Sequence, residues 1–136
     1  MRTYPSTFVT TLTAWCNNPP PGVKILEFEV TEEKVRIRFT SPEAFALAVE
    51  FFKEWPFVGL VQDGTFQTNQ QNLVLFSVSL AGNMVYRNNV HVRVLPVEFL
   101  LADAEDFEAF HMVLQGCTAD LSTALEFPAA SKVTHI

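Results

Sequence analysis

Histidine and cysteine are the residue types that most often carry catalysis or bind metals, and this chain has few of them. The three histidines, His91, His111 and His135, are far apart along the chain. The two cysteines, Cys16 and Cys117, show no metal-type spacing. No nucleophile elbow and no glycine-rich phosphate-binding loop is present. The sequence therefore predicts no catalytic motif, no metal site and no cofactor, although a folded site that unites two histidines with an acid stays open.

Local patterns suggest structural roles for some of these side chains. Both cysteines are expected to be reduced and partly buried, because a free cysteine packs as a small hydrophobic residue. Phe107, Phe110, His111 and Leu114 follow helical spacing, which predicts that His111 lies at the edge of the core and hydrogen-bonds to the backbone.

Two groups of charged residues could bind a partner. The first group is basic and occupies alternate strand positions; it consists of Lys34, Arg36, Arg38, His91 and Arg93. If these strands share one sheet, the group lies on its open face and could contact an anion, a nucleotide or RNA. The alternative is that Glu27 and Glu29 neutralise the group across a hairpin.

The second group is acidic and lies around the start of a predicted helix. Its members are Glu98, Asp103, Glu105, Asp106 and Glu108. Acids at this position can simply compensate the helix dipole. They can also form a docking face that steers a basic partner protein, which is the functional interpretation.

The hairpin of residues 24–30 and 34–39 has the most informative pattern, because apolar and charged residues alternate along both strands. One register matches apolar with apolar side chains and acids with bases. It pairs Val30 with Val35, Glu29 with Arg36, Phe28 with Ile37, Glu27 with Arg38, and Leu26 with Phe39. The charged side chains are then expected to face solvent.

A helix is predicted from Pro42 to Trp55, with Ser41 as its cap. Its apolar residues cover most of its circumference, which is wider than one sheet face can bury. Leu47, Phe51 and Trp55 are therefore predicted to contact a cover. That cover is either the N-terminal segment or a second copy of the chain, and we favour a homodimer.

The later elements are predicted from turn signals and alternation. Asp63-Gly64 indicates a hairpin turn, and residues 81–83 indicate a second turn between strands 73–80 and 84–95. A second helix is expected to begin at Asp103 and to end before Gly116. The predicted fold class is α+β, with an antiparallel or mixed β-sheet and two helices packed on one face. The nearest standard architecture is a two-layer sandwich, such as the ferredoxin-like fold.

Length and composition limit the classes of protein. The chain of 136 residues fits a single domain, 1–136, with a loosely attached N-terminal segment, 1–22, and a frayed tail, 128–136. Apolar residues make up 49% and charged residues 18%, which excludes disorder for most of the chain. The net charge of −6 argues against broad nucleic-acid or anionic-membrane binding. No apolar run is long enough to span a membrane, and we expect a cytoplasmic protein.

These observations favour a small acidic, non-enzymatic protein-binding module, of which an inhibitor, an immunity-type protein and a chaperone-like adaptor are examples. The alternative is a small-molecule-binding protein or enzyme with a Phe/Trp-lined cavity between the sheet and the helix of residues 42–55. An RNA-binding sheet is disfavoured, because the aromatic side chains of the strands are predicted to face inward.

Overall fold

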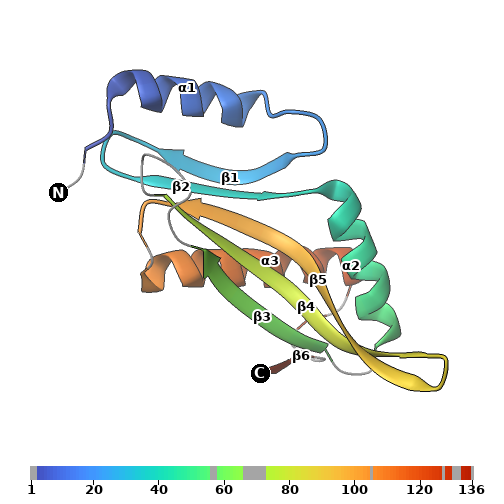
Figure 1. The fold of residues 1–136 in the computed structure, drawn as a ribbon. Helices are drawn as coiled ribbons and strands as arrows, with labels where there is room; N and C mark the ends of the chain where they lie inside the picture. The colour runs from blue at the N-terminus through green and yellow to red at the C-terminus, as the bar shows by residue number, and fades with distance from the viewer. Residues whose placement is uncertain are drawn as a thin grey trace.

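A single mixed β-sheet organises the chain in a computed structural model, which describes residues 3–55, 58–65, 73–104, 106–126, 128–129 and 133–135. The helices are α1 (Ser6–Asn17), α2 (Pro42–Glu54) and α3 (Phe107–Leu125). The strands are β1 (Lys24–Val30), β2 (Val35–Thr40), β3 (Val58–Thr65), β4 (Val74–Tyr86), β5 (Asn89–Ala102) and β6 (Val133–His135). Their order in the sheet is β1-β2-β5-β4-β3-β6, and all pairs are antiparallel except β3 with β6 (Figure 1). The predicted α+β class is confirmed.

The helices cover the two faces of the sheet unequally. α2 and α3 pack on one face of β3, β4 and β5 and enclose the larger core. α1 packs on the opposite face, where Tyr4 and Cys16 join Val35 and Ile37 in a second core. Two helices on one face are as predicted, but α1 adds a third layer over β1 and β2 (Figure 1). For residues 1–16 the sequence predicted either a helix or an edge strand, and α1 with its buried Cys16 decides for the helix.

The register predicted for the first hairpin is confirmed for its four pairs from Val30–Val35 to Glu27–Arg38. A bulge then shifts the register, so that Phe39 pairs with Ile25 instead of the predicted Leu26. The prediction that the charged side faces solvent holds for Glu27 and Glu29, which are exposed, but is wrong for the two arginines. Arg36 and Arg38 are only 3% and 7% exposed, because α3 covers that face of β2.

Two predicted turns are wrong, because the strands continue through them. Asp63 and Gly64 lie inside β3 and pair with β4, and Gly82 lies inside β4 and pairs with Arg93. The turn between β4 and β5 is at Arg87 and Asn88, whose φ angles are 52° and 63°. Two consecutive left-handed residues are the mark of a type I′ hairpin turn, here formed without glycine.

The boundaries and the buried face of α3 also differ from the prediction. Asp106, and not Asp103, caps the helix by accepting a hydrogen bond of 2.9 Å from the Ala109 N–H. The helix runs through Gly116 to Leu125. Its buried residues are Ala109, Val113, Cys117, Leu121 and Leu125. Phe107 is 81% exposed and stacks on the exposed His111, so the predicted apolar stripe was rotated from the true one.

The apolar surface of α2 is only partly covered. Val49 and Phe52 are buried in the larger core, and Trp55, just after the helix, is 7% exposed. Leu47 is 50% exposed. The N-terminal segment is not its cover, because α1 packs on the other face of the sheet. A homodimer stays a prediction.

The end of the chain joins the fold through two short described segments. Ala129 is buried, and β6 pairs with β3. The sequence had suggested a frayed tail over residues 128–136.

A substitution at Gly82 tests how closely Trp55, the residue just after α2, packs on the sheet. A Cβ atom at this position would lie 2.5 Å from Cδ2 of the Trp55 indole, which is a rigid ring. Gly82→Ala is therefore expected to destabilise the protein by about 1–3 kcal/mol, although alanine suits a strand better than glycine. Urea denaturation measures the change. Asn83→Ala, at the exposed next position, is the control, and equal effects of the two variants would contradict this packing.

Candidate functional site

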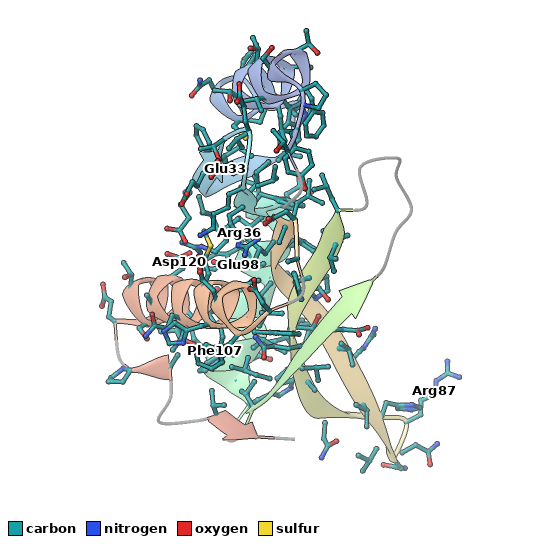
Figure 2. The ribbon with its side chains drawn as sticks, turned by 90° about the vertical axis from the view of Figure 1, so that its left-hand side faces the viewer. Glu33, Arg36, Arg87, Glu98, Phe107 and Asp120 are labelled. Carbon is teal, nitrogen blue, oxygen red and sulfur yellow. The ribbon has the colours of Figure 1, made fainter. Side chains whose placement is uncertain are left out.

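A buried arginine forms the centre of the most unusual group of side chains. Arg38 of β2 donates through Nη1 to Glu98 Oε1 at 2.5 Å and to Asp120 Oδ2 at 2.6 Å. Its Nε donates to Glu27 Oε1 at 3.0 Å. These four residues, which we name the Arg38 cluster, come from β1, β2, β5 and α3, and Figure 2 shows Glu98 and Asp120 between α3 and the sheet. Three carboxyl groups thus share one guanidinium.

Gly116 explains how α3 can lie so close to this arginine. A Cβ atom on Gly116 would lie 2.5 Å from Arg38 Nε, so any larger residue would push the guanidinium away from the helix. The sequence analysis took this glycine as a helix end. Its role is instead to let the side chain of β2 pack directly against the helix backbone.

Glu98 and Asp120 both accept a hydrogen bond from Arg38 Nη1, but their pKa values are shifted in opposite directions. Burial raises the pKa of Glu98 to about 8, and a hydrogen bond with Asp120 adds to the rise, while Arg38 opposes it. Burial alone would raise the pKa of Asp120, but its hydrogen bonds with Glu98 and Arg38 outweigh this effect and lower it. Glu98 therefore holds a proton near neutral pH, whereas Asp120 is ionised.

The carboxyl groups around Arg38 also shift the pKa of its guanidinium and that of nearby Cys117. Burial lowers the pKa of Arg38, but the hydrogen bond with Asp120, the charge of Glu98 and the hydrogen bond with Glu27 raise it by more. Nearby Cys117 has its pKa raised, first by burial and then by Glu98 and Asp120, so it is a thiol rather than a thiolate. Both cysteines are buried and unbonded, as the sequence predicted.

The basic and acidic groups predicted as separate sites meet and neutralise each other. Arg36 forms ion pairs with Asp103 and Asp106. Lys34 pairs with Glu108 and lowers the pKa of that carboxyl group. Glu98 is fully buried, so it cannot belong to a surface that a partner touches. Binding roles for the exposed acids stay predictions.

Not all the predicted site residues gather here. His91 and Arg93 lie on β5, in its exposed part, away from the ion pairs of β2. Glu105 lies outside the described residues. Asp120 was missed, because the sequence analysis ended the helix before it. Its helical spacing from Gly116, one turn earlier, and from Val113, two turns earlier, was the signal that could have placed it beside the sheet.

A pocket of about 350 Å³ opens beside the Arg38 cluster, between β1, β2, α2 and α3. It is lined by Lys24, Leu26, Thr40, Pro42, Phe45, Glu98, Asp120, Thr123 and Ala124. Glu98 Oε2 is buried and has no hydrogen-bond partner among the described residues. A cavity lined by Phe and Trp was predicted between the sheet and α2. Phe45 does line the pocket, whereas Trp55 packs on Gly82.

The far end of β4 and β5 forms a second notable surface, which we name the ribbon, residues 83–94. It projects beyond the rest of the sheet in Figure 1, and Figure 2 shows Arg87 at its tip. Val90, Val92 and Val94 are 68%, 71% and 54% exposed. Alternating valines often mark the buried face of a strand, but these three lie on an exposed face. They face the side of the sheet away from α2 and α3, since Val94 pairs with Ala81 while the neighbouring pair, Leu95–Leu80, faces the larger core.

Other kinds of site and other sources of identification give no lead. Within the described ranges, no three histidine, cysteine, aspartate or glutamate residues gather as a metal site. None of the described helices combines the length and the apolar character needed to cross a membrane. No protein-family model matches the chain, and neither a curated protein nor a solved structure matches it. The Arg38 cluster, the pocket beside it and the ribbon are therefore the candidate functional features of this chain.

The raised pKa of Glu98 predicts a pH dependence of stability. The folded chain binds more protons than the unfolded chain between the ordinary value of 4.5 and about 8. The free energy of unfolding therefore has its full contribution from Glu98 below about pH 4.5 and loses it as pH rises through about 8. Glu98→Gln removes this titration, so the variant should gain stability relative to the wild type over that range. Urea denaturation across the range measures it.

The control for this pH series is Glu50→Gln, at an exposed position of α2. Its stability should follow the wild-type curve at every pH. A constant difference between Glu98→Gln and the wild type would show that Glu98 is ionised throughout in the folded protein.

Proposed function

We propose that this chain is a non-enzymatic protein-binding module whose ribbon binds an extended segment of a partner protein. The observation that carries the proposal is the exposure of Val90, Val92 and Val94 on one face of β5. Contiguous apolar surface that stays in contact with water is costly, and it commonly marks an interaction site.

The edge of β5 supports binding of a strand. β2 pairs with β5 only from Phe99 to Ala102, and no described strand pairs with that edge of residues 89–95. Residues 89–94 are all exposed. Unpaired edges attract additional strands, and proteins usually protect them with proline, inward-pointing charge or very short length. Between Asn89 and Leu95 there is no proline, so a partner strand can extend the sheet.

Charge indicates the chemistry of the partner. No aspartate or glutamate occurs from Gly64 to Val97, although this segment contains Arg87 and Arg93. Removing these two positive charges from the total of −6 leaves −8 on the rest of the chain. A basic ribbon on an acidic protein favours an acidic segment. We therefore propose an occupant that alternates apolar side chains, packed on the valines, with acidic side chains.

This occupant differs from the basic partner suggested by the sequence, because Asp103, Asp106 and Glu108 already pair with bases of the same chain. Whether the module acts as an inhibitor, an immunity-type protein or an adaptor stays a prediction. A second copy of the chain, bound edge to edge through β5, is the competing occupant and an outcome of the experiment.

The test uses a soluble peptide of alternating valine and glutamate, with a valine–lysine peptide of equal length as its counterpart. The acidic peptide should bind and shift the amide resonances of residues 89–94. Val92→Glu should weaken this binding about tenfold or more, since it removes one buried valine and adds a repelling charge. Leu47→Glu, on exposed α2, is the matched control and should leave it unchanged.

Three results would overturn the proposal. One is equal binding of the two peptides, and another is resonance shifts confined to α2. The third is a dimer, detected by light scattering, that Val92→Glu dissociates, because the second copy would then be the occupant of the edge.

A further inference from the structure

The pocket beside the Arg38 cluster has both apolar and polar lining residues, as ligand sites do, and it is independent of the ribbon. The apolar lining residues are Leu26, Pro42, Phe45 and Ala124. The polar part of the lining presents the carboxyl groups of Glu98 and Asp120 together with the hydroxyl-bearing Thr40 and Thr123. Its volume of about 350 Å³ lies at the small end of the range for small-molecule pockets.

Glu98 supplies the observation that points to a ligand. It is fully buried, it lines the pocket, and its Oε2 lacks a hydrogen-bond partner among the described residues. A buried polar atom without a partner is destabilising, and such atoms are rare in folded proteins. The other carboxyl oxygen is already occupied by Arg38. Once Glu98 is ionised, a donor group in the pocket would therefore complete the hydrogen bonding of its carboxylate.

The charges around the pocket select the kind of donor. Glu27, Glu98 and Asp120 face a single guanidinium, and Lys24, at the pocket wall, is the further cation near Asp120. When all three acids are ionised, they carry three negative charges against the two positive charges of Arg38 and Lys24. The group then has a net charge of −1. The proton held by Glu98 corrects this imbalance. A cationic ligand would correct it equally well, and Glu98 would then release its proton.

We propose that this pocket binds a small primary amine with an apolar body. The ammonium group donates to Glu98 Oε2 and to Asp120, and the apolar body packs on Phe45 and Leu26. An anion is disfavoured, because the carboxylates outnumber the cations at the polar wall. A neutral alcohol would leave Glu98 protonated and would add no ion pair at the polar part of the lining.

Three probes of equal chain length separate these cases: hexylamine, hexanol and hexanoate. Isothermal titration calorimetry near neutral pH should show binding of hexylamine, with hexanol and hexanoate at least tenfold weaker. Repeating the hexylamine titration in buffers of different ionisation enthalpy should reveal proton release, because Glu98 ionises when the amine binds. Equal affinity for hexylamine and hexanol, or no binding of hexylamine, would overturn the proposal.

Two variants test whether hexylamine binds in this pocket. Glu98→Gln should reduce the affinity for hexylamine at least tenfold and abolish the proton release. Ala124→Phe changes an exposed residue of α3 and fills the apolar side of the pocket, so it tests the site without disturbing the buried cluster. Its matched control is Gln115→Phe, also exposed on α3 but outside the pocket lining. Ala124→Phe should abolish binding and Gln115→Phe should not. An equal effect of the two would show that the amine binds elsewhere.

Discussion

The burial of the Arg38 guanidinium beneath α3 is the constraint on which much of this structure depends. An ion taken out of water is tolerated only when it is paired and hydrogen-bonded, and removing one partner of such a group is strongly destabilising. Arg38 finds its partners 11, 60 and 82 residues away along the chain, in β1, β5 and α3. The cluster therefore connects the first hairpin to the body of the sheet and fixes the position of the last helix. Gly116 belongs to the same constraint, because only glycine leaves room for the guanidinium against that helix.

Alternation along the first hairpin predicted which residues pair, but not which face is covered. Matching acids with bases was enough to place Glu29 opposite Arg36 and Glu27 opposite Arg38. A charged face normally meets water, so this face was expected to be exposed. Its actual cover is α3, which brings carboxyl groups to the arginines from far along the chain. The valines of the ribbon show the same limit. Their alternation with polar residues predicts a strand with two distinct faces, but it does not show which face another element covers.

Glycine was the other main source of error. Gly64, Gly82 and Gly116 were interpreted as signs of turns or helix ends, because glycine most often has that meaning in a sequence. Gly64 lies inside a paired strand, and the other two are positions where an indole or a guanidinium approaches the backbone closely. Such approach depends on a side chain from another element, which one sequence does not reveal. The true hairpin turn at Arg87 and Asn88 has no glycine, and the sequence predicted there only a bulge or break at Asn88 and Asn89 within one strand.

One irregularity in β5 links the two candidate sites. Val94 and Glu98 are four residues apart, so a regular strand would point both side chains to the same face. The register of β5 against β4 shifts between Val78 and Ser79, where Pro96 and Glu98 are the successive partners and Val97 is the extra residue. This bulge turns Glu98 to the face of α3, while Val94 stays on the opposite face. The Thr40 hydroxyl donates to the Val97 carbonyl at 2.5 Å and holds the bulge against β2. A single extra residue thus allows one strand to present valines to solvent at one end and a buried acid to the pocket at the other.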